Sequence, residues 1–90
     1  MNSFHYDPQI DCAYFALAKP ISTTLCEEVG SGVILEYDAT QTPVGIELLG
    51  VETLSQYDLE PLRDKITPQN YVKLMRLLRE NNIDRFHQSV

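Results

Sequence analysis

The fold of this chain is decided by the stretch GVILEYDATQTPVGIELLG, residues 32–50, in which two apolar runs flank a polar turn. Apolar residues alternate along both runs, which is the period of a strand with one buried face. An antiparallel hairpin with residues 39–42 as its loop would place apolar side chains opposite one another on that face. Shifting the register by one residue would pair core residues with outward ones, so the pattern favours a single register. The predicted pairs are Asp38 with Pro43, Tyr37 with Val44, Leu35 with Ile46 and Val33 with Leu48.

The other face of this hairpin has three carboxylates, Glu36, Asp38 and Glu47, beside the apolar residues Ile34 and Leu49. Carboxylates that lie together can share a proton or bind Mg²⁺ or Ca²⁺ through oxygen, so the three acids are candidate ligands. Alternatively they are structural residues that pair with basic side chains from the end of the chain. In that case we expect Glu47 to accept hydrogen bonds from the backbone of a neighbouring loop. The apolar neighbours on this mixed face indicate that something partly covers it.

The residues before the hairpin are also strand-like. The segment DPQID, residues 7–11, predicts a turn held by hydrogen bonds between Asp side chains and nearby backbone. It leads into a strand over residues 12–18, and residues 22–29 predict another. The pattern changes near residue 53, after which it is helical. We therefore predict an α+β fold in one domain, residues 1–90: an antiparallel β-meander of four to five strands over 1–52 and a tail over 53–90 with one or two C-terminal helices.

The clearest predicted helix is TPQNYVKLMRLLREN, residues 67–81, with Thr67 as its cap and Pro68 in its first position. Its apolar stripe is formed by Tyr71, Leu74, Met75 and Leu78, at helical spacing. Leu77 lies outside that stripe, so a contact with another element or subunit would explain it. Arg76 and Arg79 lie on the same helix. We therefore predict an interaction surface formed by Ile34, Leu49, Leu77, Arg76 and Arg79.

The net charge of −6 is unevenly distributed along the chain. Residues 1–62 contain ten acids and one base, for a net charge of −9, whereas residues 63–90 contain six bases and three acids, for +3. Phosphate binding needs concentrated positive charge, so nucleic-acid binding is not expected. The asymmetry indicates a basic tail that folds onto its own acidic sheet, or onto the sheet of a neighbouring copy.

Two cysteines, Cys12 and Cys26, and two histidines, His5 and His87, lack the spacing of a metal site, so no metal is predicted there. No catalytic or cofactor-binding residue can be named, and no cofactor is expected. The chain shows no secretory signal and no run long enough to span a membrane, so we expect a cytoplasmic protein with no membrane contact.

An ordered set of short motifs resembles the small prokaryotic domain-of-unknown-function family 2283 over about residues 4–52. The first motif matches at Tyr6, Asp7, Asp11, Tyr14 and Leu17, the second at Glu28, Gly32, Val33, Tyr37 and Asp38, and the third at Val44 to Glu47. The resemblance supports the fold and implies no catalytic residues. It implies an antitoxin-like role as one function, because some members are thought to lie beside candidate toxin genes.

These observations predict a non-enzymatic protein-interaction module, homo-oligomeric and antitoxin-like or regulatory, that binds a protein partner. The alternative, from another class, is a metal- or small-ligand-binding protein or an enzyme that uses Glu36, Asp38 and Glu47.

Overall fold

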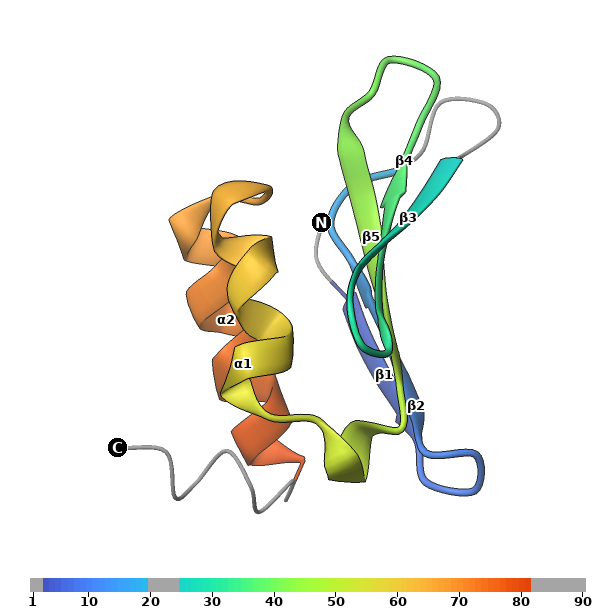
Figure 1. Cartoon of the computed structure of the whole chain (residues 1–90), viewed down its shortest axis with the longest axis vertical. Helices are drawn as coiled ribbons and strands as arrows, with labels where there is room; N and C mark the ends of the chain where they lie inside the picture. The colour runs from blue at the N-terminus through green and yellow to red at the C-terminus, as the bar shows by residue number, and fades with distance from the viewer. Residues whose placement is uncertain (1–2, 20–24, 82–90) are drawn as a thin grey trace.

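The structure, a computed structural model, describes residues 3–19 and 25–81. Five strands form one antiparallel sheet and are followed by short helical turns and a longer helix, which confirms the predicted α+β fold. The helices form a second layer on one side of the sheet (Figure 1). In chain order the elements are β1 (Ser3–Asp7), β2 (Cys12–Ala16), β3 (Leu25–Gly30), β4 (Val33–Tyr37), β5 (Pro43–Leu49), η1 (Val51–Thr53), α1 (Gln56–Leu59), η2 (Glu60–Asp64) and α2 (Pro68–Glu80).

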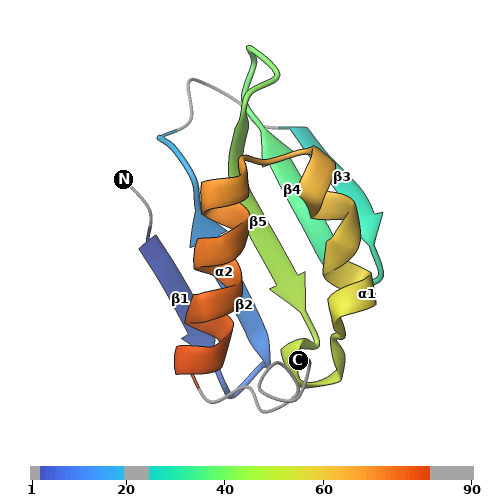
Figure 2. The same ribbon diagram turned by 90° about the vertical axis from the view of Figure 1, so that its left-hand side faces the viewer.

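The strand order is β1-β2-β5-β4-β3, so β5 lies in the centre of the sheet and the order departs from a simple meander. β5 buries four of its seven residues, whereas Leu25 to Glu28 of the edge strand β3 are all exposed. A central position gives β5 a neighbouring strand on each side. This position removes the largest amount of apolar surface from water. α2 lies in front of the β1 and β2 side of the sheet, and α1 with η2 lies in front of the β4 and β3 side (Figure 2). Residues 22–24 of the predicted third strand fall outside the described residues.

The register of the β4–β5 hairpin agrees with the prediction only in part. Val33 pairs with Leu48 and Leu35 with Ile46, as the alternation predicts, but Tyr37 pairs with Pro43 instead of Val44. Val44 is the extra residue of this irregularity, and its carbonyl accepts hydrogen bonds from two backbone N–H groups beyond the end of β2. Pro43 has no N–H to donate, and the strands end at the pair Tyr37 and Pro43. The Asp38 N–H beyond this pair bonds the Thr42 carbonyl of the connecting loop at 3.0 Å.

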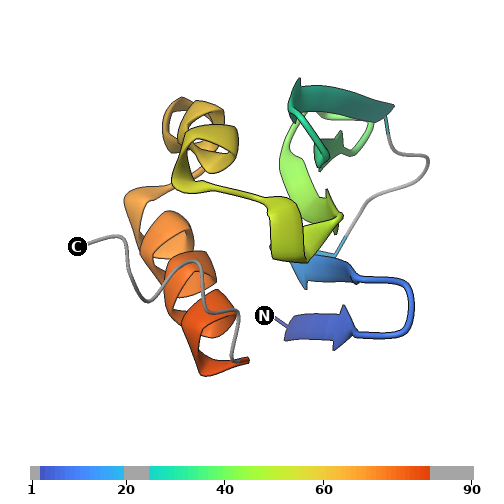
Figure 3. The same ribbon diagram turned by 60° about the horizontal axis from the view of Figure 1, so that its bottom comes forward.

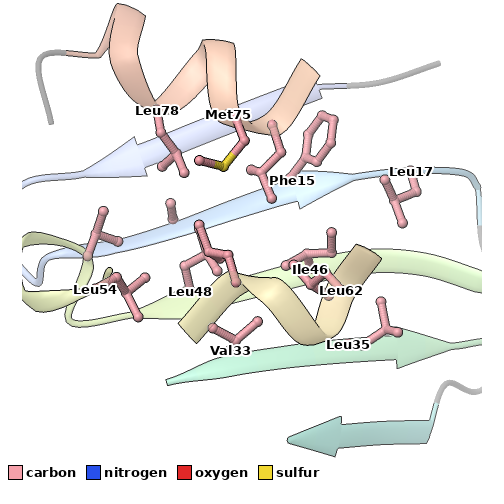
Figure 4. Packing of buried hydrophobic residues seen from close by; sticks show 14 residues of the cluster. Phe15, Leu17, Val33, Leu35, Ile46, Leu48, Leu54, Leu62, Met75 and Leu78 are labelled. Atoms are coloured by element: carbon pink, nitrogen blue, oxygen red, sulfur yellow. The ribbon is translucent and has the colours of Figure 1, made fainter. Parts of the chain in front are cut away.

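The hydrophobic core lies between the sheet and the helices (Figure 4). The sheet contributes alternate residues of its inner face, and α2 contributes the predicted stripe of Leu74, Met75 and Leu78, with Tyr71 packed at the margin. The other members of the cluster are Ala13, Phe15, Leu17, Val33, Leu35, Ile46, Leu48, Val51, Leu54, Leu59 and Leu62.

The tail begins as two short helical turns and then reverses into α2 (Figure 3). Leu59 and Leu62 of the first part are fully buried, and Pro61 lies in the first turn of η2, where its missing N–H costs no helical hydrogen bond. Thr67 caps α2 as predicted, because its hydroxyl accepts a 3.2 Å hydrogen bond from the Asn70 N–H.

The basic tail folds onto the acidic sheet of its own chain, which is one of the two arrangements that the charge distribution predicts. The Lys65 ammonium lies 3.5 Å from the Glu27 carboxylate of β3. The same carboxylate accepts a 2.7 Å hydrogen bond from the Tyr37 hydroxyl. This bond, together with Lys65, lowers the pKa of Glu27. The bond to Glu27, with partial burial, raises the pKa of Tyr37 to about 12. The contact joins η2 to the exposed edge of the sheet.

Candidate functional site

The sheet face turned away from the helices, called the outer face below, is the part of the molecule where the predicted carboxylates and apolar residues gather. Within residues 3–19 and 25–81 no helix covers it, and the views of Figures 1 and 3 agree on this. Its central row crosses the whole sheet, since residues that pair across antiparallel strands point to the same face. From β1 to β3 that row is His5, Tyr14, Glu47, Ile34 and Glu28.

Tyr14 reaches across β5 to bind Glu36 on β4. Its hydroxyl donates a 2.9 Å hydrogen bond to the Glu36 carboxylate, so the ring lies over Gly45 between them. A Cβ at Gly45 would lie 2.6 Å from the Tyr14 ring carbon that bears the hydroxyl, and 3.1 Å from the Glu36 carboxylate. Partial burial and the bond to Glu36 raise the pKa of Tyr14 to about 12. The Glu36 carboxylate therefore has a structural role, because it accepts the hydrogen bond that holds the Tyr14 ring in place.

Glu47 lies between Tyr14 and Ile34 in the central row and is half-buried. In the described part of the chain its carboxylate makes no hydrogen bond, so the predicted bonds to a neighbouring loop are not found there. Beside it is a shallow depression of about 180 Å³ between β1, β2 and the 8–11 turn. Its walls are formed by His5, Asp7, Ile10, Cys12, Ala13, Tyr14 and Glu47.

Asp38 does not share the outer face with Glu36 and Glu47, so this part of the prediction is wrong. Only 3% of its surface is exposed, and its carboxylate accepts hydrogen bonds from the Thr40 N–H (2.9 Å), the Thr40 hydroxyl (2.6 Å) and the Thr42 N–H (3.3 Å). The register change at Tyr37 turns Asp38 toward its own loop. The Thr40 and Thr42 N–H groups of this loop need an acceptor, and the buried Asp38 carboxylate supplies it.

The role expected of Glu47 is performed by Asp11 instead. Asp11 has a positive φ of 54°, which Asp tolerates, and its carboxylate accepts the Glu52 N–H at 3.1 and 3.2 Å. It also accepts a 2.8 Å bond from the Tyr6 hydroxyl, and this bond is the main reason that the pKa of Tyr6 rises to about 12. The structural interpretation of the first turn is confirmed, and Asp7 accepts the Gln9 N–H at 3.0 Å. Sequence reasoning missed the long-range contact to Glu52, because no local pattern links positions so far apart.

The predicted interaction residues lie on opposite sides of the molecule. Ile34 is half-buried on the outer face and Leu49 is 39% exposed there. Leu77 is half-buried against the core, so a contact within the chain explains this residue. Arg76 and Arg79 are exposed on α2, and Arg76 lies 3.7 Å from Glu80. Between residues 63 and 81 the bases of the tail therefore do not pair with Glu36 or Glu47, since the helices cover the other face (Figure 1).

Among residues 3–19 and 25–81, no set of three or more His, Cys, Asp or Glu side chains is arranged to hold a metal ion. A larger hollow of about 400 Å³ lies between the sheet and the start of α2, beside Pro43 and Ile66. Lys65 on its wall is already paired with Glu27.

His87 falls outside the described residues. Of the helices described, none is both long and apolar enough to cross a membrane.

Together these features define an α+β protein whose sheet has helices on one face and a mixed acidic and apolar patch on the other. The model of the family described as Protein of unknown function (DUF2283) matches residues 3–51, more than half of the chain, so the protein belongs to that family. The match covers all five strands and ends where the helical tail begins. No curated protein and no solved structure matches the chain.

Proposed function

We propose that this protein is a non-enzymatic protein-interaction module and that the outer face of its sheet binds the partner. One observation carries the proposal. In the described residues the helices cover only the inner face, while the outer face has exposed Tyr14 and Leu49 beside Ile34 and the carboxylates. Apolar and aromatic residues flanked by polar ones are typical of protein-binding surfaces.

The charge of the outer face indicates the chemistry of the partner. Its described residues include the carboxylates of Glu28, Glu36 and Glu47 and no lysine or arginine. A basic, partly apolar protein segment complements such a surface, because opposite charges speed association and apolar contacts supply affinity. An antitoxin-like role, which the family resemblance implies, and a regulatory role are both compatible with such a partner.

The same charges restrict how a homo-oligomer could form. Two outer faces packed against each other would bring like carboxylates together, which disfavours a face-to-face dimer. Self-association would instead place α2 of one copy, with Lys73 and Arg76, on the acidic face of the next. Such head-to-tail contacts give rings or open chains rather than simple dimers. We therefore favour a separate basic protein as the partner.

The test is capture of partners by the tagged full-length protein from its native host, with identification by mass spectrometry and light scattering for the mass of the complex. Leu49→Lys places a positive charge on the outer face, and Val72→Lys makes the same kind of change on α2, where Val72 is 63% exposed. We expect the wild type and Val72→Lys to capture the same protein in stoichiometric amount, and Leu49→Lys to lose it. Capture lost by Val72→Lys but kept by Leu49→Lys would place the interaction on the helix and contradict the proposal.

A further inference from the structure

We propose that the depression beside Glu47 receives an arginine side chain of the partner protein. This inference rests on the proposed function, because it assigns one anchor residue within the outer-face interface. The depression lies over Cys12, between Tyr14 on one side and the turn that contains Ile10 on the other.

The size of the depression fits one side chain better than a metabolite. Its volume is about 180 Å³. Pockets that bind small molecules usually have roughly 300–1,000 Å³ and enclose most of the ligand. Protein interfaces, in contrast, often depend on a few anchor side chains that enter small pockets, and arginine is one of the residues most enriched among them.

The charges of the walls select a cation. The wall residues include two carboxylates, Asp7 and Glu47, and no lysine or arginine. Glu47 is half-buried, and within residues 3–19 and 25–81 its side-chain carboxylate makes no hydrogen bond. A carboxylate that has lost part of its water without gaining a partner is stabilised by a cation that donates hydrogen bonds to it.

The apolar parts of the walls favour arginine over lysine. A guanidinium group can stack against an aromatic ring and donate two parallel hydrogen bonds to one carboxylate, whereas an ammonium acts as a point charge. Tyr14 and Glu47 supply the ring and the carboxylate on neighbouring strands, directly opposite each other. Ile10, which is 66% exposed at the turn, offers an apolar surface to the methylene groups of the incoming side chain.

The experiment is an NMR titration of the ¹⁵N-labelled full-length protein with Nα-acetyl-arginine methylamide. The lysine analogue tests the guanidinium, and the neutral citrulline analogue tests the charge. We expect shifts centred on Cys12, Tyr14 and Glu47 with a Kd on the order of 1–10 mM for arginine, weaker binding of lysine and no localised response to citrulline. Glu47→Gln should weaken arginine binding about tenfold, the value of roughly one charged hydrogen bond. Glu80→Gln removes the same charge from α2 and should leave the affinity unchanged.

Several results would overturn the inference. The first is that the arginine analogue causes no localised shifts, or the same shifts as the citrulline or the lysine analogue. The second is that Glu47→Gln binds the arginine analogue as tightly as the wild type does. The third is that the same residues respond more strongly to Ca²⁺. The two proposals fail in different ways. If Leu49→Lys loses the partner while arginine gives no response, only the pocket is wrong. If Leu49→Lys still captures the partner, the outer face itself is the wrong surface.

Discussion

The contact of Tyr14 with Gly45 gives the sharpest prediction, because one added methyl group tests the geometry of the outer face. The ring of Tyr14 crosses Gly45 to reach Glu36, so Gly45→Ala would place a carbon 2.6 Å from the ring. This separation is too short for a stable contact. The ring must swing away, and its 2.9 Å hydrogen bond to Glu36 must break. In a Tyr14→Ala protein the same Gly45→Ala change meets no ring.

The magnitude follows from two opposing contributions. Losing a hydrogen bond to a charged group costs roughly 1.5–3 kcal/mol, and we take about 1.5 kcal/mol because the Tyr14 side chain is partly exposed. Alanine in a strand is favoured over glycine by about 0.5–1 kcal/mol, which offsets part of this loss. Gly45→Ala should therefore destabilise the wild type by about 0.5–1 kcal/mol and stabilise the Tyr14→Ala protein by about 0.5–1 kcal/mol. The coupling free energy is then about 1.5 kcal/mol.

The assay is urea unfolding followed by far-UV circular dichroism, since the chain has no Trp to serve as a fluorescent probe. Four proteins complete the cycle: the wild type, the two single variants and the double variant. A Tyr14→Phe protein is the control that keeps the ring but has no hydroxyl bond to lose, so the ring can move aside and Gly45→Ala should not destabilise it. Additivity of the two single changes within about 0.5 kcal/mol would refute the reasoning, as would a stabilising effect of Gly45→Ala in the wild type.

Three further predictions concern stability. Asp38→Ala should destabilise by about 2–3 kcal/mol in urea unfolding, because the N–H groups of its loop lose a buried acceptor, and a loss below about 0.5 kcal/mol would contradict that role. Leu77→Asp should lower the free energy of unfolding by about 1–2 kcal/mol and leave the mass measured by light scattering unchanged. A changed mass in a variant that stays folded would show that Leu77 belongs to an interaction surface. The folded protein raises the pKa of Tyr6, Tyr14 and Tyr37 to about 12, which stabilises the fold below the unfolded tyrosine pKa near 10. This stabilisation is lost as the pH rises from about 10 to about 12, so the melting temperature should fall over that range. Phenolate absorbance should show these three tyrosines ionising late, and ionisation of all five tyrosines near pH 10 would contradict the prediction.

The candidate site was predictable only where it follows from strand alternation. Ile34, Glu36 and Glu47 share a face in any sheet built on the predicted register, and they do so in the structure. Asp38 was misplaced because the alternation was continued by one residue past the point where Pro43 ends the ladder. The hydroxyl partner of Glu36 could not be predicted, because it comes from a strand that is distant in sequence and depends on which strands are neighbours.

By itself, the amino-acid sequence determined the main secondary-structure elements of this protein. Period-two alternation, turn residues and a capped stripe at helical spacing are local signals, so they specified the hairpin, the buried face and the start of α2 at Thr67. The tertiary structure alone decided the strand order, with β5 in the centre. From that order follow the meeting of Tyr14 with Glu36, of Asp11 with Glu52, and the uncovered outer face. These contacts join residues far apart in the chain, and they exist only because burying the apolar surface selects one arrangement of the strands.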